Sequence, residues 1–518
     1  PTASSIASTR RTRSKVVSEE RIRSLRYGDR PALWVLVACL VGWLLAYHHL
    51  LLYGGLALGP LVVGAFLLSR RRGWGLDRFF LLLPLFVIAY GVYADQRFQS
   101  LRTMPRAVTL RDASVRVNYP VASSAESAIR YDAALLVEDG REIPILLTLP
   151  GVSDELYGVM LRGDLDLVAL LGDTLPGSYR RYLLGEGYAA QGYGQSLETA
   201  GRARTLRCRL MEGRHGLISR FDVAVGDQLS AADKGLIYAL CLGERLHLSR
   251  SVKSDFTSSG VAHVLAVSGY HLGIVFGLLS GLLGLLLPAY RHRRLRYLLI
   301  LLGLFLYTLL TGASTATVRA FVMSGIYLLA KLLGRRADPV QVLSLTLLFF
   351  LFHSPLSILS VGLLLSVSAV WGLMSFMPIL LRLVSPSLRS LRFVWSSLAA
   401  CISAQIGVLP FLFLFFGKAA GSMLWSAIPV VALSGLLIPV GLVTLALPSL
   451  PGLPWLLSLL SGAMRAVTEN FGSPELSLTV TMQYDLVLVV LYYTIVLTAR
   501  ELFVRLYNRS RSYSALSD

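Results

Sequence analysis

Long apolar stretches separated by short polar loops occupy most of this chain, and this pattern predicts a polytopic α-helical membrane protein. A helix needs about 20 mostly apolar residues to cross a bilayer, and we predict about 12 such spans. Some runs are short or contain proline, so re-entrant or broken helices are the alternative for them. The predicted spans are 32–48, 50–69, 79–94, 262–287, 297–313, 317–333, 339–352, 356–377, 393–416, 421–447, 453–467 and 486–506.

Between residues 95 and 261 the pattern changes to short runs in which apolar and polar residues alternate, as in SVRVNYPV and EIPILLTL. Alternation with a period of two predicts strands, and Asp-Gly within 137–141 predicts a hairpin turn. Strands spread over about 100 residues form a small β-barrel or sandwich, and an OB-like barrel fits that size. We therefore expect one extracytoplasmic small β-barrel (OB-like) domain inserted among the helices.

These changes of pattern also set the expected domain boundaries. The first apolar run follows a basic tail and lacks a small-residue cleavage site, which favours a signal anchor. The tail itself is rich in Ser, Arg and Thr, a composition typical of disorder. The expected parts are a disordered basic cytoplasmic tail (1–31), N-terminal transmembrane helices (32–95), the OB-like domain (96–200), a linker with amphipathic interfacial helices (201–261), a second transmembrane domain (262–507) and a cytoplasmic tail (508–518).

Charge adds information about topology more than about a ligand. Apolar residues make up 54% of the 518 residues, charged residues 15%, and the net charge is +19. Lys and Arg concentrate in the cytoplasmic loops of membrane proteins. With about 12 spans and the N-terminus inside, every basic patch falls on the cytoplasmic side. We therefore expect a multi-pass protein of the cytoplasmic membrane with both termini inside. The patches lie at 10–15, 70–72, 291–296, 335–336, 382–392 and 505–511.

Several chemistries lack their sequence signatures. No glycine-rich loop precedes a Lys-Ser or Lys-Thr pair, no histidines form H-x-H or H-E-x-x-H, and no G-x-S-x-G is found. We expect no nucleotide motor, no metal, no cofactor and no enzymatic activity. Four cysteines do not make a disulfide framework. Cys208 and Cys241 both fall on the oxidising side and are either bridged or free.

The apolar stretch 260–276 contains His263, Ser268, Gly269 and His271. Ionisable groups at membrane depth cost about 2.5–3.5 kcal/mol each on insertion scales, so they indicate function by default. On a continuous helix the two histidines would lie about 80° apart. They either pack between helices, line a conduit or share a metal, and we favour the conduit.

A second polar group follows at 311–319. The hydroxyl residues of this segment cluster at a predicted extracytoplasmic helix junction, with Ser314 among them and Arg319 just inside the next span. Arg319 either snorkels to the interface, pairs with a carboxylate or binds phosphate through its planar fork. Further along, Gln405 and Pro410 interrupt an apolar run. Gln405 either bridges helices or faces a wet cavity.

Two segments outside the spans are also candidates. Residues 241–260 interleave charges such as Glu244 with apolar residues, which suits an amphipathic helix on the membrane surface or a solvated helix face. An arginine cluster lies beside several tyrosines after the β domain, and such a set either binds a single strand through charge and stacking or is a solvated linker. The candidate contacts are Arg202, Arg204, Arg207, Arg209, Tyr182 and Tyr188.

At these residues the sequence resembles the ComEC family, the inner-membrane channels for DNA uptake in natural competence. AHVLAVSGYHLGIV resembles the family's HLLAISGLHVGLV signature, and LLTGASTATVRAFVM resembles its LTGxSxSxxRAxxM segment. AQIGVLPFLFLFFG resembles AQLxxLPxxxxxFG, and PGSYRRYLLGEGYAAQ is similar to the end of the family's OB-like domain. The matches extend from about 100 to 450 along the chain and are specific together, although each is weak alone.

The sequence also departs from the family pattern. The family's GFQLSF becomes GLLLSV at 362–367, Asp-Pro becomes Ser354-Pro355, and an Asn before a later proline is absent near 426–429. These changes put in doubt any channel role that depends on those polar groups. Many members continue into a metallo-β-lactamase-like domain, whereas this chain ends at Asp518. We therefore expect the degrading nuclease to be a separate protein, or the chain to be truncated.

The resemblance implies an inner-membrane channel that passes single-stranded DNA into the cytoplasm during natural transformation. The expected partners are single-stranded DNA, membrane lipid, a periplasmic DNA receptor, a cytoplasmic helicase-like motor and a separate nuclease; whether the chain forms an oligomer is left open. The alternatives are a transporter of a small anion or lipid through the same path, and a membrane enzyme. The expected path residues are His263, Ser268, His271, Ser314, Arg319 and Gln405.

Overall fold

The computed structural model describes residues 30–47, 82–102, 107–124, 128–137, 140–150, 156–170, 177–203, 205–287, 292–384, 388–448, 450–473, 479–481 and 486–514. The chain divides into two compact units. The smaller contains Pro1–Met104 and Val322–Pro355, and the larger contains Pro105–Phe321 and Leu356–Asp518. The predicted span at 50–69 and the predicted tail at 1–31 lie almost wholly outside the described residues.

The smaller unit is helical. It contains α2 (Pro31–Tyr47), α4 (Leu83–Arg102), α12 (Pro339–His353) and the end of α11 (Thr315–Leu332), whose first residues belong to the larger unit. Helices α2 and α4 pack closely, because a Cβ on Gly42 would lie 2.3 Å from the Val87 carbonyl oxygen. The Tyr90 hydroxyl donates to the Leu351 carbonyl at 2.9 Å and ties α4 to α12. Helices therefore form at the predicted spans 32–48, 79–94 and 339–352.

The predicted β domain is a closed five-stranded barrel in the larger unit. Its strands are β1 (Ala107–Ser124), β2 (Ala128–Leu136), β3 (Glu142–Pro150), β4 (Val159–Ala169) and β5 (Ala190–Arg202), in the order β1-β2-β3-β5-β4. Alternate residues point inward and are buried, among them Val115, Tyr131 and Leu147. Five closed strands with one parallel pair, β3 with β5, match the strand number of an OB-fold. The connection from β4 to β5 contains the short helix α5 (Gly177–Gly185).

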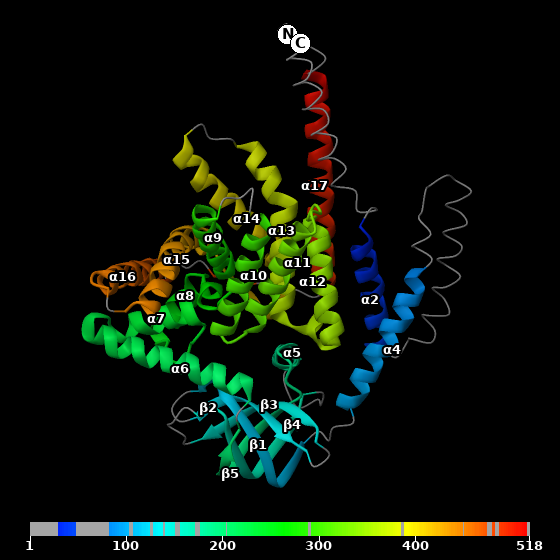
Figure 1. Ribbon diagram of the computed structural model, residues 1–518. Coiled ribbons are helices and arrows are strands. Elements are labelled where there is room, and N and C mark those ends of the chain that lie inside the picture. Colours follow the sequence, from blue (N-terminus) through cyan, green and yellow to red (C-terminus); the bar gives the residue numbers. More distant parts are fainter. Residues whose placement is uncertain are drawn as a thin grey trace. The chain divides into compact units, whose positions relative to one another are not determined.

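Three helices lead from the barrel into the membrane bundle (Figure 1). They are α6 (Leu206–Val225), α7 (Ala231–Leu242) and α8 (Arg250–Ser258), with the short turn η3 (Gly226–Gln228) after α6. α7 is apolar and almost fully buried, and Leu236 and Leu240 belong to one core with Phe221 of α6 and Phe256 of α8. The segment that the sequence places in a linker therefore packs as part of the bundle core.

The remaining helices of the larger unit are mostly long and apolar. Six helices among the described residues are long and apolar enough to cross a membrane: Gly269–Leu286, Thr315–Leu332, Val361–Leu383, Val394–Phe416, Met423–Ala446 and Val487–Leu506. The helices of this part are α9 (Gly269–Leu286), α10 (Arg293–Leu310), α13 (Val361–Leu383), α14 (Arg389–Phe416), α15 (Met423–Ala446), α16 (Leu453–Gly472) and α17 (Leu486–Ser514). Short pieces η4 (Ala262–Leu265), η5 (Pro355–Leu359), β6 (Lys418–Ala420) and β7 (Thr479–Thr481) connect them.

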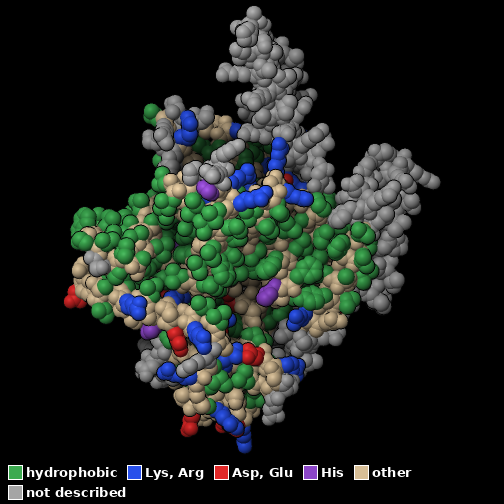
Figure 2. All heavy atoms as spheres, viewed as in Figure 1, with side chains coloured by type: hydrophobic (Ala, Val, Ile, Leu, Met, Phe, Trp, Pro, Cys, Tyr) green, Lys and Arg blue, Asp and Glu red, His purple; other side chains and the backbone are tan. Residues whose placement is uncertain are grey.

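The surface over these helices is hydrophobic. Figure 2 shows a broad band of hydrophobic side chains over the bundle helices, and charged side chains scattered over the barrel. Exposed Leu282 and Leu285 on α9 and Leu302 and Phe305 on α10 contribute to the band. An apolar surface costs nothing against lipid tails, which are as apolar as leucine. The chain is therefore a mostly helical membrane protein with a five-stranded barrel.

The cysteines are free thiols. Cys208 is buried beside Thr205 and Asn118, whereas Cys241 is buried on α7 against Gly441 of α15. A Cβ on Gly441 would lie 2.5 Å from the Cys241 sulfur, so this glycine is needed for the close approach of the two helices. The bridge between Cys208 and Cys241 that the sequence left open is not formed.

Candidate functional site

The entrance to α9 is capped by the polar residues of the predicted His-Ser-Gly-His stretch. Ser268 is the N-cap of α9, and its backbone N–H donates to His271 Nδ1 at 3.3 Å, which closes a reciprocal capping arrangement. Because Nδ1 accepts this bond, the neutral ring carries its proton on Nε2. His271 is fully buried, and its Nε2 has no hydrogen-bond partner among the described residues.

The helix that the apolar pattern predicts from 262 begins only at Gly269. Residues Ala262–Leu265 form the 3-10 turn η4 instead, and His263 on it is exposed. The two histidines therefore do not share one continuous helix, because Ser268 caps a new helix between them. His271 stabilises the start of α9, and His263 lies outside it.

The predicted hydroxyl cluster lies in the turn between α10 and α11. Gly312 and Ala313 both have positive φ, at 77° and 49°, which reverses the chain between the helices. Ser314 Oγ then accepts the N–H of Thr317 at 3.3 Å and contacts its hydroxyl at 2.8 Å. This side chain satisfies an orphan donor at the start of α11. Ser314 thus caps the helix that contains Arg319.

Arg319 lies one turn inside α11 and is 8% exposed. Its Nε has no hydrogen-bond partner among the described residues. A Cβ on Gly362 would lie 3.1 Å from Arg319 Nη2, so the guanidinium rests against the first turn of α13. Nearby, the Cβ position of Gly269 is 3.7 Å from that of Ala320, which brings the start of α9 to the same part of α11.

Glu186, which the sequence did not single out, supplies the anion beside Arg319. It follows α5, and its carboxylate accepts a hydrogen bond from Thr315 Oγ1 at 3.2 Å. Burial raises the pKa of Glu186, and the nearby charge of Arg319 opposes that increase. Gly185 brings α5 into backbone contact with α13, because a Cβ there would lie 2.3 Å from Ser360 Cα. The barrel connection therefore reaches the membrane helices themselves.

The only hint of Glu186 in the sequence is its setting. The acidic residue stands between two glycines in LLGEGY, at the end of a short helix. Gly187 has φ of 95°, and its N–H donates to the Leu184 carbonyl, which ends α5 and turns the chain back to the barrel. Such a pattern predicts a helix end but not a partner 129 residues away.

A second buried pair lies where α6 and α7 meet the turn between α10 and α11. Arg214 and Glu244 form an ion pair in which both side chains are buried. Arg214 Nη1 also donates to the Leu242 carbonyl at 3.3 Å, and Glu244 Oε1 accepts the Leu246 N–H at 3.2 Å. Gly312 leaves room for the guanidinium. Glu244 is therefore a buried partner and does not lie on the surface of an amphipathic helix.

The predicted amphipathic segment 241–260 is not one helix. α7 ends at Leu242, and α8 begins at Arg250. α8 buries Val252 and Phe256 in the core and exposes Lys253. Its polar face is therefore a solvated helix face on a core element.

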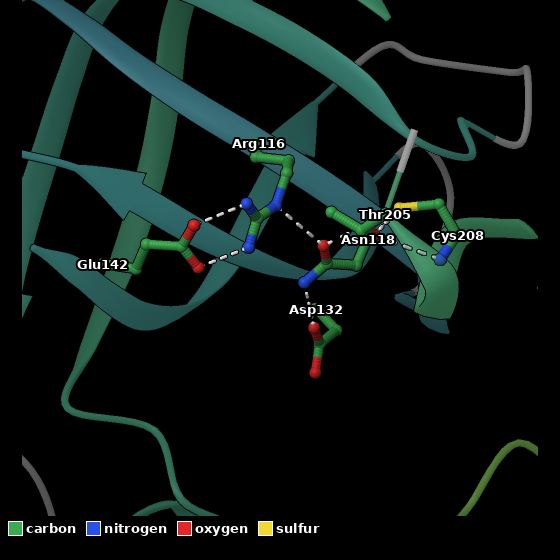
Figure 3. Close-up of polar contacts among 6 residues, drawn as sticks. All are labelled: Arg116, Asn118, Asp132, Glu142, Thr205 and Cys208. Atoms are coloured by element: carbon green, nitrogen blue, oxygen red, sulfur yellow. Dashed lines mark hydrogen bonds and ion pairs between the residues drawn. The ribbon is translucent and has the colours of Figure 1, made fainter. Parts of the chain in front are cut away.

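The barrel holds α6 through a polar network (Figure 3). Asn118 Nδ2 donates to Asp132 at 2.6 Å, and the Cys208 thiol at the start of α6 lies 3.9 Å from Asn118 Oδ1. Arg207 donates to the Tyr119 hydroxyl at 2.7 Å and pairs with Asp132 at 3.4 Å. Tyr188 donates to the same carboxylate at 3.4 Å. Of the predicted DNA contacts, Arg207 binds α6 to the barrel, and Tyr188, which precedes β5, bonds to the same barrel carboxylate.

The other predicted contacts differ in their surroundings. Arg202 and Arg209 are exposed, and Tyr182 is exposed and stacks on Tyr179 with 6.4 Å between ring centroids. Arg204 lies outside the described residues.

Gln405 is half-buried on α14, in a stretch where Gly407 packs against the Ser368 carbonyl of α13. Among the predicted path residues, Ser314 and Arg319 share one helix start, with the cap of α9 beside it.

Comparisons with known proteins agree with the motif resemblance. The family model described as "Competence protein" matches residues 240–505. "ComE operon protein 3" of Bacillus subtilis is 27% identical over 68% of this chain and 43% of that protein. "Recombination protein 2" of Haemophilus influenzae is 30% identical over 40% of this chain and 27% of that protein.

An "Uncharacterized protein YcaI" of Escherichia coli is 31% identical over 27% of this chain and 19% of that protein. The chain thus spans less than half the length of these curated relatives. No solved structure matches the chain. Because the family model covers more than half of the residues, the chain belongs to the competence protein family, the ComEC family that its motifs resemble.

Proposed function

We propose that this protein is an inner-membrane channel that passes single-stranded DNA into the cytoplasm during natural transformation. Membership of the competence family motivates the proposal. In it, the chain crosses the membrane about 12 times with both termini in the cytoplasm, and the barrel faces the periplasm. The observation that carries the proposal is Arg319, a buried arginine with a free Nε at the barrel side of the membrane helices.

A strand with one charge per phosphate needs cationic and hydrogen-bonding groups along its route. A buried arginine is rare in a membrane helix and marks a functional path by default. The planar guanidinium group of arginine can donate two parallel hydrogen bonds to phosphate oxygens, and a contact with phosphate carries no preference for the base sequence. Ser314 and Thr315 stand just before Arg319 in the chain, at the start of the same helix. The group therefore suits a substrate of any sequence.

The barrel would present the strand to this entrance. OB-like barrels bind single strands through basic grooves and stacked aromatic rings. The exposed Tyr182, stacked on Tyr179, lies on α5, the helix that ends at Glu186. Arg202 and Arg209 supply exposed positive charge near the end of β5 and on α6. In this proposal a periplasmic receptor delivers the DNA, a helicase-like motor draws it inward, and a nuclease removes the other strand.

Uptake of labelled DNA tests the proposal. Deletion of the gene should abolish entry of label into the cytosol and leave binding at the cell surface intact. The wild-type gene should restore entry, and Arg319→Ala should not. Normal entry in the deletion strain contradicts the proposal. If the deletion instead changes only the flux of a small anion or lipid, the chain is a transporter of that class.

A further inference from the structure

Three groups that can bind an anion lie near the start of α13. Arg319 lies against Gly362 in the first turn of this helix. The first N–H groups of any helix have no intrahelical partner and give its N-terminus a partial positive charge. A guanidinium at such a helix end is unfavourable unless an anion lies with it. Thr315 adds a hydroxyl donor on the facing helix.

Glu186 is the anion at this place. Its carboxylate accepts from Thr315, and its charge acts on Arg319. It also lies at the C-terminal end of α5, where the negative end of that helix faces the positive group. Among the described contacts, no direct ion pair joins Glu186 to Arg319, and Arg319 Nε has no partner. The positive group is therefore incompletely neutralised.

We propose that Arg319, Thr315 and the first turn of α13 form a phosphate site, and that Glu186 occupies it as a resident anion that a DNA phosphate displaces. This inference rests on the proposed function. A carboxylate and a phosphate diester present the same kind of acceptor oxygens to an arginine fork. Displacement requires the end of α5 to move, because Glu186 follows this helix directly and Gly185 lies against Ser360 at the start of α13.

The role of this arrangement is to reduce the uncompensated positive charge beside Arg319 when no strand is bound. A bare buried arginine is costly, so an internal anion stabilises the resting protein. Binding of a phosphate exchanges one anion for another at little electrostatic cost. The exchange also frees α5 together with the Tyr179–Tyr182 stack that it bears. The barrel connection thus responds to the arrival of a strand.

Binding measurements on the purified full chain in nanodiscs test this inference. The probes are inorganic pyrophosphate, a labelled oligothymidylate and a short-chain phosphatidylglycerol. Glu186→Gln keeps the shape and the Thr315 contact but removes the competing charge. It should raise the affinity for pyrophosphate and for the oligonucleotide by about fivefold, the scale of one partly buried ion pair. Glu212→Gln, on the exposed face of α6, is the matched control and should change nothing.

The gain must depend on Arg319. Adding Arg319→Ala to Glu186→Gln should remove the gain in affinity. It should also reduce the steepness of log K for the oligonucleotide against log salt concentration by about 0.7, the value for one phosphate contact on a single strand. A folded Glu186→Gln protein with unchanged or weaker pyrophosphate binding overturns the inference. If Glu186→Gln does not fold, Glu186→Asp, with its shorter reach, should give a smaller gain, and its absence overturns the inference equally.

The probes separate this inference from the proposed function. If Glu186→Gln gains affinity for pyrophosphate, but neither it nor the wild type binds the oligonucleotide, this outcome supports the phosphate site and contradicts the proposed DNA channel. If the gain is confined to phosphatidylglycerol, the site takes a lipid phosphate, and the displacement by DNA is wrong. If DNA uptake in cells depends on the gene but Glu186→Gln binds every probe with unchanged affinity, the channel proposal is supported and the role of Glu186 as resident anion is wrong.

Discussion

Two arginine–glutamate sets, one buried and one partly buried, lie at the junction of the barrel and the membrane helices, and they differ in how far their polar atoms are satisfied. Arg214 and Glu244 pair directly and also bond to the backbone at Leu242 and Leu246. Arg319 has a free Nε, and Glu186 reaches it only through its charge and Thr315. A satisfied pair fixes two elements together, whereas an unsatisfied one is free to exchange partners.

The first pair joins α6 to the end of α7, and the second joins the barrel connection to α11 and α13. Removal of one member of a buried pair leaves the other charged and uncompensated. The loss of stability is large where every polar atom of the pair has a partner, and small where one charge already lacks a direct ion pair. We therefore expect the loss of Arg214 to affect mainly stability, and the loss of Arg319 to affect mainly function.

The largest effect is expected from Arg214→Ala. It should destabilise the protein by about 3–5 kcal/mol, because Glu244 is left buried without its partner. Thermal unfolding of the purified protein measures the loss. Arg220→Ala, an exposed position on the same helix, should be neutral. Replacement of both partners, Arg214→Met with Glu244→Leu, should recover most of the stability, and failure to recover would show that the backbone bonds matter more than the pair.

Arg319→Ala should change function more than stability. Its loss should lower DNA uptake at least about tenfold, because a hydrogen bond to a charged group contributes about 1.5–3 kcal/mol. Its unfolding temperature should stay close to that of the wild type, since Glu186, whose pKa is already raised by burial, can take up a proton. Arg335→Ala, exposed after α11, is the control. A drop in stability as large as that of Arg214→Ala would erase the contrast between the two sets.

Gly185→Ala should loosen α5 without disturbing the Arg214 pair. The added Cβ would lie 2.3 Å from Ser360 Cα, so α5 must move away from α13, at a cost of about 1–3 kcal/mol. Hydrogen exchange should speed up in α5 and remain unchanged in α6. Gly273→Ala, on a helical glycine with open space around it, serves as the control. Equal acceleration in both helices would mean that the two junctions form one cooperative unit.

The smallest effect is expected at an exposed pair on the barrel. The hydrogen bond from Arg116 lowers the pKa of Glu142, so the pair stabilises the barrel at neutral pH. This contribution is lost as the pH falls through the lowered pKa, below the ordinary value of 4.5. Glu142→Gln should cost less than about 1 kcal/mol at neutral pH and nothing in acid. Glu198→Gln, exposed on β5, should show no such pH dependence.

Local patterns predicted the elements of this protein well. Apolar length predicted the positions of the described membrane helices, because a helix must cover the bilayer thickness whatever surrounds it. Alternation predicted the barrel strands, since the two faces of a strand meet different environments. The hydroxyl cluster at the start of α11 was also placed correctly, because capping is a contact between near neighbours.

The site could be predicted only in part. Arg319 and Ser314 stand out in an apolar sequence, but Glu186 does not stand out in a polar one. His271 was predicted to line a conduit; in the structure it caps a helix whose start the apolar run did not reveal, and its place on a conduit stays a prediction. Arg207 and Tyr188 were predicted to contact DNA; in the structure both bond to Asp132 of the barrel, and the DNA contact stays a prediction. For Arg207 and Tyr188 the partner is a carboxylate distant in the sequence, whereas His271 bonds to Ser268 three residues away, at a helix start that the apolar run did not reveal.

The sequence by itself determined that this chain is a competence-family membrane protein with a barrel and apolar helices, because those features follow from length, period and motif. Only the tertiary structure decided which carboxylate faces which arginine. Glu244 meets Arg214 across 30 residues, and Glu186 meets the start of α11 across 129. Such pairings depend on the packing of whole elements, and no local pattern records them.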